Sequence, residues 1–154
     1  MIDDAVKLII VCNPNNPTGT LVPIADIEKI ARVGKNAIVL VDEAYVEFSQ
    51  TSAISLIRRY PNIIITRTLS KAFGLASLRI GYVIARKEYI NELNKIRGPF
   101  DVNMLAQVAA AAALQNVDDM KQYAREIMTQ AKPIVEKFFK TNGILFYPSS
   151  ANFI

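Results

Sequence analysis

The sequence predicts an α/β fold: a three-layer, mostly parallel sheet with one antiparallel strand, followed by a helical part. Short apolar runs alternate with helical patterns over residues 7–85, which is typical of parallel strands joined by crossover helices. The link from Thr68 to Arg79, which contains Gly74, lies at the lower limit of length for a parallel crossover. The strand after this link is therefore predicted to run antiparallel.

Turn residues divide the first half of the chain into its elements. Buried strands are predicted over the apolar runs at residues 7–12, 37–41, 62–67 and 80–85. A helix is predicted between Pro23 and Gly34, because Ile24, Ile27 and Ile30 recur at helical spacing. A shorter helix is predicted over residues 52–60, and Pro61 ends it.

Helical patterns dominate the second half. Helices are predicted over residues 87–96, 103–115 and 118–140. Gly98-Pro99 separates the first two, and Pro133 is expected to interrupt or kink the third. Gly143 ends the last helix. The apolar residues 144–147 then predict a further strand, and residues 151–154 predict part of another.

The composition excludes several kinds of chemistry. The 154 residues include no histidine and one cysteine, Cys12. A Ser-His or Cys-His mechanism, a histidine or cysteine-cluster metal site and an intrachain disulfide are therefore excluded. The net charge of +4 is carried by scattered lysines and arginines, which argues against a nucleic-acid partner. No secretory signal or membrane-spanning run is visible, and we expect a cytoplasmic protein.

Polar side chains cluster in the loops at one edge of the predicted sheet. The loops after the three parallel strands and before the antiparallel one supply Asn16, Asp42, Tyr45, Thr68, Ser70, Lys71 and Arg79. The carboxyl edge of an open α/β sheet is where ligands bind. Each residue also has an ordinary interpretation: Asp42 as a cap, Lys71 as a solvated surface group, and residues 13–19 as a simple turn. The Ser70-Lys71 pair alone would also suit a serine nucleophile activated by lysine.

Together these residues fit one cofactor, pyridoxal phosphate. Its aldehyde requires a lysine amine, and its pyridine nitrogen requires a carboxylate partner. Its phosphate requires an arginine and hydroxyl donors, and its ring oxygen requires neutral donors. Lys71, Asp42 and Arg79 match the first three requirements. Asn16 and Tyr45 match the last.

Three segments resemble the fold-type I pyridoxal-phosphate aminotransferases, and within them the histidinol-phosphate aminotransferases. These segments are Asn13-Pro-Asn-Asn-Pro-Thr-Gly19, Asp42-Glu-Ala-Tyr45 and Ser70-Lys-Ala-Phe-Gly-Leu-Ala-Ser-Leu-Arg-Ile-Gly81. Pro99-Phe-Asp-Val-Asn103 and Tyr147-Pro-Ser-Ser-Ala-Asn-Phe153 add to the resemblance. The histidinol-phosphate group commonly has Asn at the position of Asp101.

The resemblance implies a role for each candidate residue. Lys71 would be the Schiff-base lysine and proton shuttle, and Asp42 would bind the pyridinium nitrogen. Tyr45 and Asn16 would hold the ring oxygen. The phosphate would be bound by Ser70 and Arg79, with Thr68 as a weaker candidate. No metal is expected.

The resemblance also implies an activity and its partners. The expected reaction transfers an amino group between L-histidinol phosphate and 2-oxoglutarate in histidine biosynthesis, by a homodimer. Alternatives within the enzyme class are an aromatic or aspartate-type aminotransferase and a phosphothreonine decarboxylase. A non-catalytic cofactor-binding or dimerisation module is the alternative from another class.

Family members are considerably longer than this chain, so we interpret it as a central fragment. Residues 1–100 would be part of the large cofactor-binding domain. Residues 101–154 would be linking helices and the start of a small C-terminal α+β domain. Alone, the fragment is expected to be inactive, because it would lack the upstream phosphate-binding loop, the ring-stacking aromatic residue and the downstream carboxylate-binding arginine.

Overall fold

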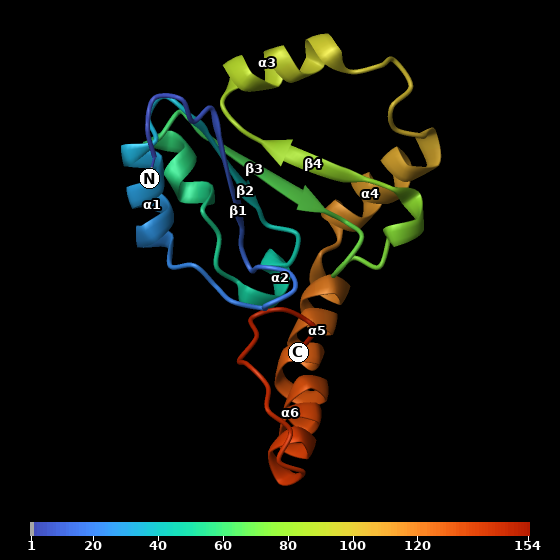
Figure 1. Cartoon of the computed structure of the whole chain (residues 1–154). Coiled ribbons are helices and arrows are strands. Elements are labelled where there is room, and N and C mark those ends of the chain that lie inside the picture. The colour runs from blue at the N-terminus through green and yellow to red at the C-terminus, as the bar shows by residue number, and fades with distance from the viewer. Residues whose placement is uncertain (1) are drawn as a thin grey trace.

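The computed structural model describes residues 2–154, which form a four-stranded mixed sheet with neighbouring helices (Figure 1). The sheet has the order β1-β2-β3-β4, and its strands are β1 (Leu8–Cys12), β2 (Ile38–Asp42), β3 (Ile63–Thr68) and β4 (Gly81–Ile84). β1 and β3 both run parallel to β2, whereas β4 pairs antiparallel with β3. The four predicted strands and the reversed direction of the last are confirmed.

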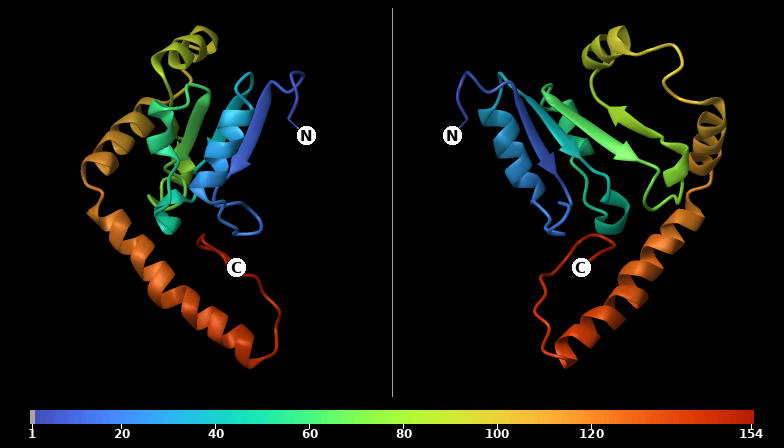
Figure 2. Two further views of the ribbon diagram at one scale, coloured as in Figure 1. Left: turned by 90° about the vertical axis from the view of Figure 1, so that its left-hand side faces the viewer. Right: turned by 45° about the vertical axis from the view of Figure 1, so that its right-hand side comes forward.

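The main apolar core lies on one face of this sheet, under α1 (Ile24–Val33) and the 3-10 helix η1 (Ile54–Arg58) (Figure 2). We call it the sheet core. Its buried members are Ile27, Ala31, Val39, Val41, Ala53, Leu56, Ile63 and Ile65. α1 follows Pro23 and ends where the Gly34 amide donates to the Ile30 carbonyl, as predicted. On the other face of the sheet, Leu8 and Ile10 remain exposed.

The segment between β2 and β3 differs in detail from the prediction. A four-residue helix, α2 (Val46–Ser49), was not predicted, and it ends at Gln50 in the left-handed conformation. The helix predicted over residues 52–60 is the tighter and shorter η1. Pro61 cannot continue a helix and disfavours helical geometry in the residue before it, so η1 ends at Arg58.

The C-terminal half is helical. Its elements are α3 (Lys87–Ile96), α4 (Met104–Gln115), α5 (Asp118–Glu126), the π-helical segment η3 (Ile127–Ala131) and α6 (Lys132–Thr141). The predicted helix over residues 118–140 is thus interrupted by η3, which ends two residues before Pro133. Proline lacks the amide donor of a regular helix, and a π turn is one way to accommodate the missing bond. Within residues 2–154, no helix is long and apolar enough to cross a membrane.

The strands predicted at residues 144–147 and 151–154 were wrong. Both segments have irregular backbone. Their apolar pattern suits a strand, but a strand also needs a neighbour with which to form a hydrogen-bonded ladder. No strand among residues 2–154 pairs with either segment. Instead, the chain returns from the end of α6 toward the lower end of the sheet, where β1 and β2 terminate (Figures 1 and 2).

Candidate active site

The loops that carry the candidate residues leave the sheet at one level. The ladder continues past the strand ends, with the Asn13 amide donating to the Asp42 carbonyl at 2.8 Å and the Glu43 amide to the Thr66 carbonyl at 2.9 Å. Asn13 is buried, and its side chain exchanges two hydrogen bonds with the backbone of Val22, at 2.7 and 3.1 Å. A buried amide satisfied in this way fixes the loop after β1 against the sheet.

Asp42, at the end of β2, has a fixed carboxylate. It lies opposite Cys12 in the parallel register. Its Oδ1 accepts a hydrogen bond from the Ala44 amide at 3.1 Å, and its Oδ2 is 3.8 Å from the Cys12 thiol. The hydrogen bond from the Ala44 amide orients the carboxylate, and among residues 2–154 Oδ2 meets only the weak thiol donor. This geometry fits both the capping interpretation and a carboxylate available to a ligand.

Two other predicted residues, each from a different loop, contact Tyr45. The Asn16 amide donates to the Tyr45 hydroxyl at 2.8 Å. The Lys71 ammonium lies 5.4 Å from the centroid of the Tyr45 ring, within range of a cation–π contact. The Tyr45 ring is buried, whereas Lys71 and Asn16 are exposed. An amine, an amide and a phenol therefore share one accessible place at the strand ends.

The remaining candidates lie in the connection between β3 and β4, which contains the short 3-10 helix η2 (Ala76–Leu78). The Thr68 hydroxyl accepts a hydrogen bond from the Ser70 amide at 3.1 Å. Arg79 is in the left-handed conformation and donates to the Ala76 carbonyl at 2.9 Å. Because Thr68 pairs with Gly81 in the antiparallel register, Arg79 returns to the same edge of the sheet.

The structure thus brings the predicted residues together in two groups, around Tyr45 and around Thr68. Asn16, Tyr45 and Lys71 form the first group, and Thr68 and Ser70 form the second. Among residues 2–154, no hydrogen bond joins Asp42 or Arg79 to another predicted site residue. These two share the sheet edge with the groups but do not touch them through polar contacts.

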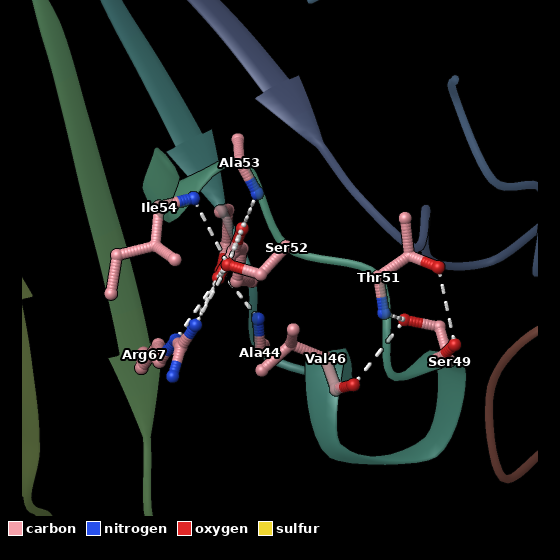
Figure 3. A network of polar contacts seen from close by, with 10 residues as sticks. Ala44, Val46, Ser49, Thr51, Ser52, Ala53, Ile54 and Arg67 are labelled. Atoms are coloured by element: carbon pink, nitrogen blue, oxygen red, sulfur yellow. Dashed lines mark hydrogen bonds and ion pairs between the residues drawn. The ribbon is translucent and has the colours of Figure 1, made fainter. Parts of the chain in front are cut away.

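A buried ion pair next to this edge of the sheet was not predicted from the sequence. The Glu43 carboxylate accepts from the Arg67 guanidinium at 2.8 and 3.0 Å, from the Ser52 hydroxyl at 2.9 Å and from the Ala53 amide at 2.7 Å. Figure 3 shows Ser52, Ala53 and Arg67 pointing toward one common place beside the end of β2. Glu43 follows Asp42, and Arg67 precedes Thr68. By strand alternation, the pair therefore fixes the ends of β2 and β3 from the face opposite to Asp42 and Thr68. The sequence did contain a signal for this ion pair. Glu43 and Arg67 carry opposite charges, and they directly follow two residues that pair between β2 and β3.

A second apolar cluster, which we call the strand-end cluster, packs under the site. Its buried members are Tyr45, Phe48, Ala72, Ala124 and Ala151. Phe153 packs against it, with its ring centroid 5.1 Å from that of Tyr45 and an interplanar angle of 82°. Phe153 has no role predicted from the sequence. Its contact with Tyr45 depends on the return of the C-terminal segment, which no local pattern reveals.

Comparisons with known proteins point to one family. The sequence matches the family described as aminotransferase class I and II over residues 2–154. It is 44% identical over 158 aligned positions to a histidinol-phosphate aminotransferase of Hydrogenovibrio crunogenus, covering 99% of this chain and 42% of that protein. It is also 44% identical to a dihydroxyacetone phosphate transaminase of Campylobacter jejuni, covering 97% of this chain and 41% of that protein.

The fold agrees with these matches. The crystal structure of a histidinol-phosphate aminotransferase from Sinorhizobium meliloti, in complex with pyridoxal-5'-phosphate, superposes with a TM-score of 0.84 at 30% identity. The match covers 94% of this chain and 40% of that structure. The chain spans about two fifths of the length of the curated relatives it matches.

Proposed function

Because this chain belongs to the aminotransferase class I and II family, we propose that the protein carrying it is a pyridoxal-phosphate-dependent aminotransferase. Its proposed reaction moves an amino group between L-histidinol phosphate and 2-oxoglutarate. The observation that carries the proposal is the meeting of Asn16, Tyr45 and Lys71 at the sheet edge that also holds Asp42.

The donors present at this edge fit pyridoxal phosphate. The Lys71 amine is exposed and reaches over the Tyr45 ring, so it is accessible to an aldehyde. Within the described part of the chain, the Asp42 carboxylate retains an oxygen that meets only a thiol. Neutral donors are paired at Asn16 and Tyr45. When bound, the cofactor would supply an aldehyde that condenses with amines and a protonated ring that stores electrons.

Each residue then has a task that its position allows. Asp42 would keep the pyridine nitrogen protonated, held for this by the Ala44 amide. Tyr45 and Asn16 would donate to the ring oxygen. Ser70 and Arg79 would bind the phosphate, with Thr68 orienting the Ser70 backbone. The Lys71 amine, once free, would carry a proton between the α-carbon of the substrate and the aldehyde-derived carbon of the cofactor.

The substrate pair is proposed from the relatives. Several curated relatives bear the name histidinol-phosphate aminotransferase at 39–44% identity. The Campylobacter relative is named for dihydroxyacetone phosphate and is equally similar. A transaminase for another small phosphorylated substrate is therefore the second candidate. The names histidinol phosphate and dihydroxyacetone phosphate share a phosphate group, so a phosphorylated substrate is common to both proposals.

The biological setting is proposed on the same basis. The protein would act in histidine biosynthesis, in the cytoplasm, as a homodimer. Residues 1–100 would belong to the cofactor-binding domain, and residues 101–154 would connect it to a smaller domain. These assignments rest on the family.

Asp42→Asn provides the activity measurement. The amide cannot keep the pyridine nitrogen protonated, so turnover with histidinol phosphate and 2-oxoglutarate should fall by roughly 10² or more. Steady-state glutamate formation measures the loss, and circular dichroism checks the fold. Near-normal turnover of the variant would show that Asp42 is only a cap. Turnover of unmodified protein with dihydroxyacetone phosphate as amino acceptor and glutamate as donor, but not with histidinol phosphate and 2-oxoglutarate, would favour the second candidate.

A further inference from the structure

The C-terminal segment, residues 149–153, is held at the site by a buried lysine of α6. Lys132 is 8% exposed, and its ammonium donates to the carbonyl oxygens of Ser149 and Ala151, the latter at 3.3 Å. The Glu136 carboxylate is 4.0 Å away. Burial lowers the pKa of the Lys132 ammonium, and Glu136 acts in the opposite direction. A buried cation requires such partners, and here two of them belong to irregular backbone.

The same segment contacts the loop after β1 from its other side. The Ser150 amide donates to the Gly19 carbonyl at 2.7 Å. Gly19 has a φ of +68°, and a Cβ at this position would collide with the Ser149 side chain. Only glycine permits both this backbone conformation and this approach. The segment is therefore fixed between α6 and the loop that carries Asn16.

The position of the segment determines what Tyr45 meets. Ala151 is fully buried in the strand-end cluster, and Phe153 follows two residues later. The Phe153 ring meets Tyr45 edge-on at 5.1 Å. The Tyr45 hydroxyl in turn accepts from Asn16. A continuous series of contacts thus runs from the ammonium of Lys132 to the pair of residues proposed to hold the cofactor's ring oxygen.

We propose that Lys132 is a positioning residue for the cofactor site, acting through the segment it holds and through the contact of Phe153 with Tyr45. The proposal rests on the proposed function for its ligand, pyridoxal phosphate. Its geometric part, that Lys132 holds residues 149–153 in place, stands on the contacts alone. Lys132 itself would touch neither cofactor nor substrate.

Three variants of the protein that carries this chain separate this role from a general effect on stability. Lys132→Met removes the donor, Lys132→Arg restores a cation able to donate to both carbonyls, and Lys137→Met removes an exposed lysine of the same helix. Lys132→Met should weaken pyridoxal phosphate binding by about tenfold, the size expected for losing a hydrogen bond to a charged group. Lys132→Arg should recover most of the affinity, and Lys137→Met should leave it unchanged.

Hydrogen exchange of the Ser150 amide provides a readout that does not need the cofactor. This amide is protected by its bond to Gly19, so it should exchange faster in Lys132→Met but not in Lys137→Met. If unmodified protein does not bind pyridoxal phosphate, the proposed function fails while the exchange result still decides the positioning role. Unchanged Ser150 exchange and unchanged cofactor affinity in Lys132→Met would overturn the proposal.

Phe153→Leu tests the route from Lys132 to Tyr45. This variant alone should weaken cofactor binding, and Lys132→Met combined with it should bind no more weakly than the poorer single variant. Additive losses would show that Lys132 acts by another route and would overturn the proposal. If Lys132→Met fails to fold, Phe153→Leu still decides, because normal cofactor affinity in that variant would contradict the role of the Phe153 contact.

Discussion

The two apolar clusters of this molecule are built in different ways. The sheet core is made of branched aliphatic and small residues from the contiguous stretch 27–65, and it joins β2 and β3 to α1 and η1. The strand-end cluster joins α2, the loop after β3, α5 and the C-terminal segment. It contains two aromatic residues and three alanines. Its members are far apart in the sequence and meet only when the whole chain has folded.

Because the two clusters are built differently, we expect one to determine the stability of the fold and the other to determine the geometry of the site. Large aliphatic side chains in the sheet core remove much apolar surface from water, so this core should supply most of the folding free energy. The alanines of the strand-end cluster bury little surface but permit close approach of backbone segments. Tyr45 belongs to this cluster and also contacts Asn16 and Lys71. We therefore expect the sheet core to govern stability and the strand-end cluster to govern ligand binding.

The largest expected effect on stability is at Glu43, whose partners include Ala53 of the sheet core. Glu43→Ala leaves the Arg67 guanidinium without its buried partner, which should lower the free energy of unfolding by about 3–5 kcal/mol. Urea denaturation measures the change. Asp26→Ala is the matched control, because its pair with Lys29 is exposed and should contribute less than about 1 kcal/mol. Equal losses in the two variants would contradict the assignment of the Glu43 pair to the fold's interior.

A smaller loss of stability is expected at Ala151, in the strand-end cluster. Ala151→Leu overfills a fully buried position, which should cost about 1–3 kcal/mol. Affinity for pyridoxal phosphate should fall with it, because the displaced segment carries Phe153 away from Tyr45. Thermal unfolding and a cofactor titration measure the two effects, with Ala25→Leu on the exposed side of α1 as the control. A variant that is destabilised yet binds the cofactor normally would contradict the expectation that the strand-end cluster governs ligand binding.

The smallest effect is expected at Glu47 on α2. Burial raises the pKa of its carboxyl, the nearby charges of Arg67 and Glu43 act in opposite directions, and Oε2 is buried with no hydrogen-bond partner among residues 2–154. The native state therefore binds this proton more tightly than the unfolded chain, and stability falls as the pH rises from the ordinary pKa of about 4.5 through the raised one.

Glu47→Gln removes this penalty. The variant should be more stable than the parent protein at neutral pH, by less than about 1 kcal/mol because the side chain is only half-buried. The difference should disappear as the pH falls below 4.5. Unfolding measured across this pH range checks the sign. A variant less stable than the parent at neutral pH would show that the ionised carboxylate is stabilising.

The sheet was predictable because its signals are local. Each strand is a short apolar run bounded by turn residues, and the short Thr68 to Arg79 link was enough to predict that β4 is antiparallel. The residues after the strands could then be placed at one edge. The strand predicted at residues 144–147 was wrong because pairing depends on a partner that the apolar pattern does not supply.

The strand-end cluster was not predictable in the same way. Tyr45 was assigned to the site from its position after β2, but its contact with Phe153 depends on η3, α6 and the returning segment. No local sequence pattern predicts that Lys132 is buried, since lysines on helices are most often exposed. Its partners are backbone carbonyls of Ser149 and Ala151, which every residue possesses.

The proposed function requires that the strand-end loops form a pyridoxal phosphate site around Lys71. The most direct measurement is borohydride reduction of the protein with its cofactor, followed by peptide mapping of the labelled lysine. The label is expected on Lys71, whose ammonium lies over the ring of Tyr45. Lys71→Ala should abolish the labelling. A label on any other lysine, or stoichiometric labelling that persists in Lys71→Ala, would contradict the account.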